Sequence, residues 1–339
     1  MGGLLLFCVS SPPEVIEAER RLASEKPTLS ATSLADGEFL KEAEAYLLDA
    51  MPYRQKFFVL HANFFTRILK NPRCHGIRLG DCGLEKLLPR YDGALCDYNL
   101  DTIEAYLKRF CDGKRAFAAL IPDKGYYTRP SGDYDQAIAS LSARDAFTLV
   151  AVRDSFCETD YFTSDIHIRP ECYGAFAARL SDAMGFDLPY GLTCARRERR
   201  QGVLAKQLPV GTLFDDFTYL YDTGGAVVSC RVTVGEKEYG GLYTDADFDP
   251  YDAYLGGEVG GGIIRVQSPK GDPTRRLIVF RDSFARAFLP YLVKGYGEII
   301  LVDMRAPYRQ LASEAALFAD DCTDILVLIS THTFFTTKF

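Results

Sequence analysis

The feature that most constrains the fold of this chain is a repeated alternation between helical patterns and short, continuous apolar runs. A helical pattern at 102–110 leads into the apolar run 116–122, and a second helical pattern at 135–144 leads into the run 147–154. A third helical pattern follows at 171–185. Apolar runs of this length, without polar alternation, indicate strands that are buried on both faces, as in a parallel sheet.

The same alternation returns towards the carboxyl end of the chain. Strands are predicted at 276–280, 298–304 and 324–330, separated by helical patterns at 283–295 and 307–319. Alternating strands and helices in both parts of the chain predict an α/β fold with a doubly wound, mainly parallel sheet and helices on both of its faces. In such folds, ligands bind at the carboxyl ends of the strands.

The region before these alternations, residues 14–70, is predicted to be helical. Apolar residues recur at three- and four-residue spacing in the runs 14–23 and 36–69, and an extended linker separates the two runs. Asp36 is expected to form the N-cap of the longer run, and Pro52 is expected to break or kink it.

Two other regions are predicted to contain antiparallel strands. The segment 74–84 has strand signals on both sides of a turn at 80–83, which predicts a hairpin. Residues 195–270 alternate short strands with glycine-rich turns, which indicates an inserted β-rich subdomain or lid. We expect residues 14–339 to form a single α/β domain that carries these additions.

The apolar segment 2–9 is far shorter than the roughly 18 residues that can span a bilayer, and no basic residue precedes it. We interpret residues 1–13 either as an ordinary buried segment or as the remnant of an export signal or membrane anchor. Elsewhere, the sequence contains no apolar run long enough to cross a membrane.

The composition excludes some classes of function. The formal net charge of -7 argues against nucleic-acid binding, because affinity for the phosphate backbone comes mainly from clustered Lys and Arg. The one basic run, 196–200, is interrupted by Glu198 and is interpreted as a solvated surface. The ten cysteines include no CxxC pair, so we expect neither a zinc ribbon nor a thioredoxin-like site, and no structural zinc. We also expect no metal ligands among the site residues and no cofactor. Their even number is compatible with disulfides if the protein is exported.

Only four histidines could act as a general base, and one of them has a carboxylate close by in sequence. His61 lies in an apolar helical pattern, His75 in a polar turn and His332 in a threonine-rich tail. His167 follows Asp165 by two residues, and in an extended segment such side chains project to the same side. The carboxylate could then hold the imidazole in the tautomer that accepts a proton from a serine. Half of a metal site is the alternative interpretation.

Ser283 is the candidate nucleophile. It comes directly after the predicted strand 276–280 and is expected near the N-terminus of the next helix. At that place, backbone N–H groups and the helix dipole could stabilise an oxyanion beside the hydroxyl. The alternative is that Asp282 or Ser283 only caps the helix.

Several segments together resemble the bacterial DHHW family, which is related to the SGNH-hydrolase-like proteins that O-acetylate alginate and other exopolysaccharides. The segment TDYFTSDIHIRPECYGAF resembles the part of the family that carries its name-giving motif. The segments 239–257 and 276–305 resemble its C-terminal half. Segments 17–30, 36–57 and 76–84 resemble its N-terminal half, so the resemblance extends over almost the whole chain.

The resemblance implies a catalytic triad of Ser283, His167 and Asp165 on an SGNH-hydrolase-like fold. Ile166 stands where the motif has its first His, and Ile168 stands where it has Trp. The missing His is not the implied base, so the triad is retained, whereas the loss of Trp affects the shape of the pocket.

Four further residues at matched positions are candidates for binding the substrate or an oxyanion. Arg281 and Arg305 could bind an anionic or acyl-bearing substrate, or could instead form structural ion pairs. Gly256 and Gly257 could bring a backbone N–H close to an oxyanion, or could form a plain turn. Glu258 stands beside them where the family often has Asn.

The resemblance therefore implies a serine esterase or O-acyltransferase, most simply an O-acetyltransferase, that acts on a polysaccharide or acylated glycan of the cell envelope. It also implies an extracytoplasmic location and a membrane acyltransferase as the partner that donates the acyl group. The alternative is a non-catalytic carbohydrate-binding or assembly component, in which the many Tyr residues would supply stacking surfaces. Catalysis requires His167 within about 2.6 to 3.2 Å of Ser283 Oγ, so geometry distinguishes the two hypotheses.

Overall fold

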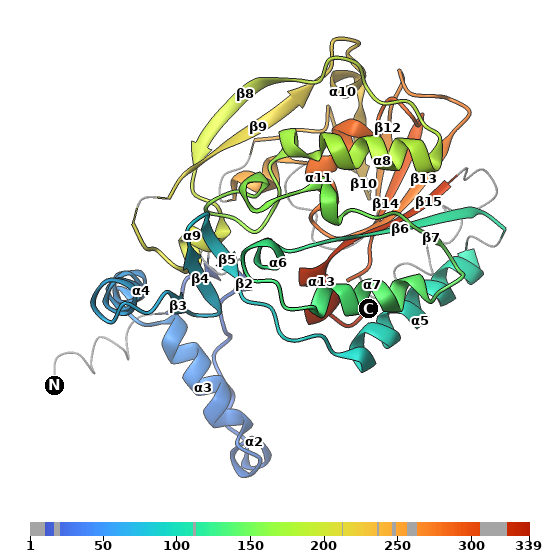
Figure 1. Cartoon of the computed structure of the whole chain (residues 1–339). Helices are drawn as coiled ribbons and strands as arrows, with labels where there is room; N and C mark the ends of the chain where they lie inside the picture. Colours follow the sequence, from blue (N-terminus) through green and yellow to red (C-terminus); the bar gives the residue numbers. More distant parts are fainter. Residues whose placement is uncertain are drawn as a thin grey trace.

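An eight-stranded sheet organises the protein (Figure 1). The computed structural model describes residues 11–16, 21–110, 113–211, 213–235, 237–245, 249–255, 263–305 and 324–339. In spatial order the strands of this sheet are β11 (Lys237–Tyr239), β10 (Arg231–Val234), β12 (Ile263–Gln267), β14 (Glu298–Asp303), β13 (Arg276–Arg281), β15 (Asp324–Ser330), β6 (Arg115–Ile121) and β7 (Thr148–Leu149).

The strands β14, β13, β15, β6 and β7 are parallel, and they form the predicted part of the sheet. All seven residues of β15 are buried. Such complete burial explains why these strands have continuous apolar sequences instead of alternating ones. The prediction of a mixed α/β fold around a mainly parallel sheet is therefore confirmed.

Helices cover both faces of the sheet. Along β13, Leu277 and Val279 pack into one apolar core, while Ile278 and Phe280 pack into another on the opposite face. The first core includes residues of α8 (Gly174–Met184) and α11 (Ala285–Phe288). The second includes residues of α5 (Gly93–Phe110), α7 (Asp133–Ser142) and α13 (Thr331–Thr336).

The region 195–270 contains the predicted antiparallel strands, but it does not form one separate unit. β10, β11 and β12 continue the central sheet, because β12 pairs antiparallel with β14. β8 (Thr193–Arg200) and β9 (Asp215–Tyr221) form a two-stranded sheet of their own. The remaining elements here are α9 (Val203–Gln207), α10 (Ala226–Ser229) and the 3-10 turn η6 (Pro250–Ala253).

The prediction of a helix at 14–23 is wrong. The described part of this run forms the antiparallel strands β1 (Val15–Ile16) and β2 (Arg21–Leu22). A helical pattern of only ten residues is too short to be stable without tertiary support, so pairing of extended segments prevails.

The expected linker also contains a short helix, and the longer helical run begins differently from the prediction. Ser30 caps α2 (Ala31–Ala35), and Asp36 is its C-cap. Gly37, with a φ of 82°, precedes α3 (Glu38–Asp49), although Asp36 Oδ1 still accepts the N–H of Glu38 at 3.1 Å.

The predicted break at Pro52 is confirmed, since α4 (Arg54–Asn63) starts anew and continues into the π-turn η2 (Phe64–Ile68). Figure 1 shows α2 and α3 extending away from the rest of the protein.

The predicted hairpin is confirmed and forms part of a three-stranded antiparallel sheet. Its strands are β3 (Arg73–Cys74), β4 (Ile77–Gly80) and β5 (Gly83–Lys86), and the expected turn joins the last two.

Two predicted elements are shorter in the structure. The strand 147–154 is reduced to β7 and is followed by the 3-10 turns η3 (Arg153–Ser155) and η4 (Glu158–Asp160). The helix predicted at 283–295 contains only the four residues of α11 and the 3-10 turn η7 (Leu289–Tyr291), where Pro290 lacks the N–H that a continuing helix needs. The helix 171–185 is present as η5 (Pro170–Tyr173) followed by α8. The pattern at 307–319 lies outside the described residues.

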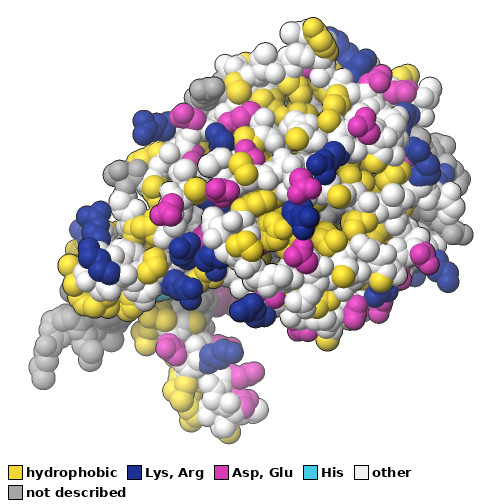
Figure 2. Space-filling view, viewed as in Figure 1, with side chains coloured by type: hydrophobic (Ala, Val, Ile, Leu, Met, Phe, Trp, Pro, Cys, Tyr) yellow, Lys and Arg dark blue, Asp and Glu magenta, His cyan; other side chains and the backbone are white. Residues whose placement is uncertain are grey.

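On the face shown in Figure 2, basic and acidic side chains of the described residues are interspersed, and neither sign forms a continuous surface. Among the helices that the structure describes, none combines the length and apolar character needed to cross a bilayer.

Candidate active site

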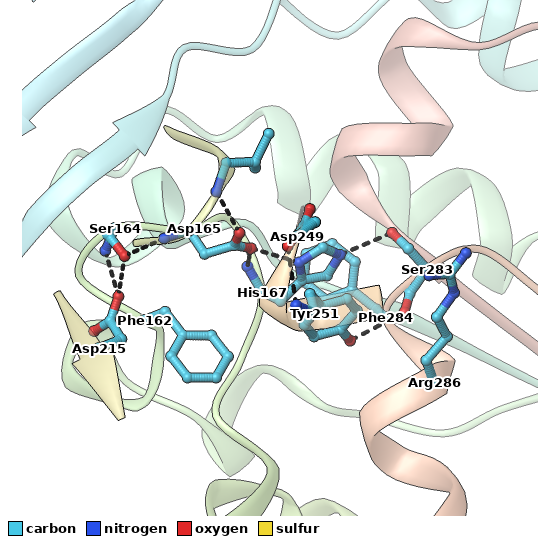
Figure 3. Close-up of polar contacts among 12 residues, drawn as sticks. Phe162, Ser164, Asp165, His167, Asp215, Asp249, Tyr251, Ser283, Phe284 and Arg286 are labelled. Atoms are coloured by element: carbon cyan, nitrogen blue, oxygen red, sulfur yellow. Dashed lines mark hydrogen bonds and ion pairs between the residues drawn. The ribbon is translucent and has the colours of Figure 1, made fainter. Parts of the chain in front are cut away.

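The structure brings Asp165, His167 and Ser283 together, although the serine lies 116 positions from the histidine in sequence. His167 Nε2 lies 2.8 Å from Ser283 Oγ, and His167 Nδ1 lies 2.6 Å from Asp165 Oδ1 (Figure 3). Asp165 and His167 are buried, whereas Ser283 is half-buried. The three side chains therefore form a continuous hydrogen-bonded relay that ends at a hydroxyl within reach of solvent.

Ser283 follows β13 at the carboxyl edge of the sheet, where Asp282 holds the chain in place. The buried carboxylate of Asp282 accepts the N–H of Phe284 at 3.0 Å and both the N–H and the hydroxyl of Ser330, at 2.8 and 2.5 Å. Ser330 ends β15, so these bonds join the ends of two adjacent strands. The alternative that Asp282 or Ser283 caps the helix is wrong, since the N-cap of α11 is Phe284 and no side chain caps this helix. Asp282 instead joins the two strand ends, and the hydroxyl of Ser283 faces His167.

The expectation of a helix dipole behind Ser283 needs correction. α11 contains four residues and begins at Ala285, so it supplies a single turn of aligned peptide groups. A helix dipole depends on many aligned peptide units, and its effect is small in one turn. The single turn of α11 therefore contributes little dipole field at Ser283.

Asp165 is fixed from two sides. Its Oδ1 accepts both the backbone N–H of His167, at 3.1 Å, and the ring Nδ1–H. Its Oδ2 accepts the N–H of Val203 at 2.9 Å. Burial alone would raise the pKa of Asp165, but attraction to His167 and these hydrogen bonds outweigh it, so the carboxyl pKa lies below its usual value. The lowered pKa favours the ionised carboxylate, and these bonds hold its Oδ1 against the imidazole.

A second carboxylate, Asp215 at the start of β9, holds the loop that carries Asp165. It accepts the backbone N–H and the hydroxyl of both Thr163 and Ser164, over distances of 2.5 to 2.9 Å. The hydroxyl of Ser164 accepts in turn the N–H of Gly202 at 2.8 Å. Sequence reasoning missed this network, because Asp215 lies far from the motif in sequence and only the fold places it beneath the loop.

Tyr251 contacts both the base and the nucleophile segment. Its ring stacks on His167 with centroids 3.6 Å apart and planes 6° from parallel, and its hydroxyl donates to the carbonyl oxygen of Ser283 at 3.0 Å. Figure 3 shows the ring lying against the imidazole. The residue was not singled out from the sequence, although it lies in segment 239–257, which resembles the family. Its neighbour Asp252 pairs with Arg286 of α11 at 3.0 Å, which joins η6 to the serine segment.

The candidate arginines Arg281 and Arg305 share one carboxylate. Arg281 Nη1 lies 3.2 Å from Asp303 Oδ2, and Arg305 donates to both carboxylate oxygens of Asp303 at 2.6 and 2.8 Å. Burial lowers the pKa of Arg281 to about 10, and the charge of Asp303 opposes this. The contacts fit the alternative of structural ion pairs at the end of β14. Gly256 and Gly257, the other candidates, lie outside the described residues.

The two positions at which the motif departs from the family have different surroundings. Ile168 is completely buried in the core. Ile166 lines a small hollow beside the triad, together with Asp165, Phe284 and His332. Burial lowers the pKa of His332.

A larger cavity, of about 690 Å³, adjoins this hollow, since Leu88 and Asp123 line both. Its wall contains both cationic and aromatic side chains: Arg73, Arg90, Arg129, Tyr126, Tyr134 and Phe335. The volume of this cavity lies within the range of small-molecule sites.

Comparison with known proteins found no matching family model and no matching curated protein. Among solved structures, a DHHW family protein from Eubacterium siraeum aligns with a TM-score of 0.58 and 16% identity, over 78% of this chain and 93% of its own. Bacillus cereus PatB1 aligns with a TM-score of 0.56 and 16% identity, over 77% of this chain and 98% of its own. The structure of PatB1 with a sulfonyl adduct aligns with a TM-score of 0.54 and 15% identity, over 78% of this chain and 98% of its own. At these identities the likeness is one of fold, and at that level the predicted relation to the DHHW family is confirmed.

Proposed function

We propose that this protein is a serine esterase or O-acyltransferase, most simply an O-acetyltransferase, with Ser283 as nucleophile, His167 as general base and Asp165 as its orienting carboxylate. The observation that carries the proposal is the hydrogen-bonded relay with its two short contacts, 2.6 and 2.8 Å, ending at a half-buried hydroxyl. The 2.8 Å between His167 Nε2 and Ser283 Oγ lies within the range that proton transfer requires. The fold shared with a DHHW family protein supports it as well.

In the first half of the reaction, Ser283 Oγ attacks the acyl carbonyl carbon while its proton passes to His167 Nε2. Asp165 stabilises the resulting imidazolium through its bond to Nδ1. When the tetrahedral intermediate collapses, the alcohol of the donor ester leaves with the proton from Nε2, and the acyl group stays on Ser283. In the second half, a hydroxyl group gives its proton to Nε2 and attacks the acyl-serine, which restores the free serine. If the hydroxyl belongs to water the reaction is hydrolysis, and if it belongs to a sugar the reaction is transfer.

The oxyanion of each tetrahedral intermediate requires N–H donors. In the described part of the chain, the N–H of Phe284 is already bonded to Asp282, whereas the N–H of Ser283 has no acceptor. We propose the N–H of Ser283 as one donor. Gly256 and Gly257 remain proposed sources of a second donor.

The substrate class is proposed to be a polysaccharide or acylated glycan of the cell envelope. The larger cavity, which adjoins the small hollow lined by Asp165, supports this, because aromatic rings pack against sugar faces and arginines donate to hydroxyl and carboxylate oxygens. An extracytoplasmic location, a membrane acyltransferase as acyl donor and a single domain at 14–339 belong to the same proposal.

A non-catalytic carbohydrate-binding component is the second candidate, and the isoleucines at 166 and 168, in place of the motif His and Trp, favour it. A binding protein would not require the hydrogen-bonded relay of Asp165, His167 and Ser283, so the intact relay favours the enzyme.

Covalent labelling with a fluorophosphonate or a sulfonyl fluoride tests the proposal. The wild type is expected to be labelled at Ser283, while Ser283→Ala and His167→Ala are not. Hydrolysis of an aryl acetate should fall by roughly three orders of magnitude or more in Ser283→Ala. Ser142→Ala, which changes an exposed serine of α7, is the matched control and should behave as the wild type. Equal labelling of the variants, or an unlabelled wild type, would contradict the enzyme and favour the binding protein.

A further inference from the structure

Three side chains with soft metal-binding atoms lie together, outside the candidate active site. They are His61 of α4, Cys74 at the end of β3 and His75 in the turn that follows. Their potential ligand atoms all lie within 4.8 Å of one another, and Cys74 Sγ lies 3.6 Å from His61 Nδ1. Cys74 is buried, while both histidines are exposed.

The turn that contains His75 does not itself require a histidine. His75 and Gly76 form a two-residue loop between β3 and β4, and both have positive φ, 52° and 69°. This conformation is that of a type I′ turn, which favours Asn, Asp or Gly in the first position. Non-glycine residues with positive φ are uncommon, although His is enriched among them, and residues in such conformations cluster at functional sites.

Aromatic rings support both imidazoles. Phe58 stacks on His75 with centroids 5.0 Å apart, and Phe65 packs against His61 at 4.4 Å. The two imidazole rings lie 5.1 Å apart. Below them, Cys74 belongs to a small apolar core with Ala62, so the backbone that carries the three side chains is well packed.

We propose that His61, Cys74 and His75 bind one zinc ion. Zinc prefers thiolate and imidazole ligands at about 2.3 and 2.0 Å in tetrahedral geometry, which separates adjacent sulfur and nitrogen ligands by about 3.5 Å. The 3.6 Å between Cys74 Sγ and His61 Nδ1 already has this value, and a ring nitrogen of His75 lies within 4.8 Å of the other two ligand atoms. Water fills the fourth position, and the thiol proton of Cys74 leaves to solvent.

The ion would join α4 to the β3–β4 hairpin. The sheet that contains this hairpin also contacts the loop that carries Asp165. In the same three-stranded sheet, the N–H of Leu84 in β5 donates to the carbonyl oxygen of Thr163 at 2.7 Å. Thr163 also lies directly against Gly83, where an added Cβ would meet its backbone oxygen at 2.4 Å. The proposed ion would stabilise a sheet that supports this loop, and it would contact none of the proposed reacting groups.

The sequence did not predict this site, because its three ligands do not form a CxxC pair or another familiar spacing. Cys74 lies thirteen positions after His61, and the residues between them include the end of α4 and the η2 turn. Only the packing of η2 and α4 against the hairpin brings the ligands together.

Zinc titration of the metal-stripped full chain, prepared without a polyhistidine tag, tests the proposal. Calorimetry should show one zinc ion per wild-type chain, and replacement by cobalt should produce a thiolate-to-cobalt charge-transfer absorption. His75→Asn retains a residue suited to positive φ, and His61→Gln changes an exposed helical position, so both variants should fold. Each should lose at least about 100-fold in zinc affinity, more than the loss of an outer-shell group causes.

Cys157→Ser is the matched control, since it removes an exposed thiol outside the cluster. Zinc should raise the melting temperature of the wild type and of this control, but not that of the two histidine variants. Failure of the wild type to bind zinc, or equal affinity in His75→Asn and His61→Gln, would overturn the proposal. Because the site is separate from the triad, this result does not depend on whether Ser283 is reactive.

Discussion

Gly202→Ala is a sharp test of how the catalytic carboxylate is held. Gly202 has a φ of −77°, which any residue adopts, so the substitution introduces no backbone strain of its own. An added Cβ would, however, lie 2.5 Å from Asp165 Cβ, 2.7 Å from its Oδ2 and 2.8 Å from the carbonyl oxygen of Ser164. The effect of the substitution is therefore purely steric.

The size of the effect follows from these distances. Ordinary contact with a Cβ begins at 3.4 Å, so either the Asp165 loop or the Gly202 segment must move by about 1 Å. Such a shift disturbs the 2.6 Å contact between Asp165 and His167 and the bond from Val203 to Asp165 Oδ2. A misplacement of 1 Å lowers catalysis by about 100-fold, and overpacking lowers the free energy of unfolding by about 1–3 kcal/mol.

The assay is kcat/KM for an aryl acetate together with the rate at which Ser283 is labelled, and the melting temperature reports stability. Gly174→Ala is the matched control, because nothing lies within 4 Å of the added Cβ at that position in α8. The control should retain full activity. Wild-type kcat/KM in Gly202→Ala would refute the argument that the close approach of Gly202 positions Asp165.

Three further substitutions test other contacts of the site. Asp165→Asn should lower kcat by about 10⁴-fold in the same assay, because the amide favours the wrong imidazole tautomer, and an unchanged kcat would exclude the orienting role. Tyr251→Phe keeps the stacked ring but removes the bond to the carbonyl oxygen of Ser283, so kcat should fall by about tenfold with KM unchanged, and a change in KM alone would contradict positioning. Asp303→Asn should destabilise the protein by about 3 kcal/mol at pH 7, measured by urea unfolding, since it leaves Arg281 buried without its partner. Burial alone would raise the pKa of Asp303, but its bond to Arg305 and the charges of Arg281 and Arg305 lower it, so its contribution is present above the unfolded pKa of about 4 and is lost as the pH falls below that value. The stability of Asp303→Asn should therefore change less between pH 5 and pH 3 than that of the wild type.

The parallel strands could be predicted because burial on both faces leaves a direct trace in sequence. The runs that became β6, β13, β14 and β15 have apolar cores without interruption, and their short length favours a buried strand over a buried helix. The helical run at 14–23 was predicted wrongly because a short amphipathic pattern has little stability by itself, and its partners decide its conformation.

The candidate triad could be predicted for a different reason. Asp165 and His167 lie two positions apart, so their contact is local, and the family resemblance supplied Ser283 as the third member. The prediction of an extended segment was wrong, because the chain bends between Tyr161 and Ile168, which pair with each other. The contacts of Asp215 and Tyr251 could not be predicted, because the sequence around a single Asp or Tyr does not indicate which distant loop or ring it will contact.

From the sequence alone came the alternation of buried strands with helices, the absence of a CxxC pair and the carboxylate two residues before one histidine. Only the tertiary structure decided that Ser283 meets His167, that Tyr251 covers the imidazole, and that His61 approaches Cys74 and His75. Local sequence patterns reflect the burial and hydrogen bonding of residues within one strand or helix, over a few positions. Contacts between distant segments depend on how whole elements pack, and this information is spread over the entire chain.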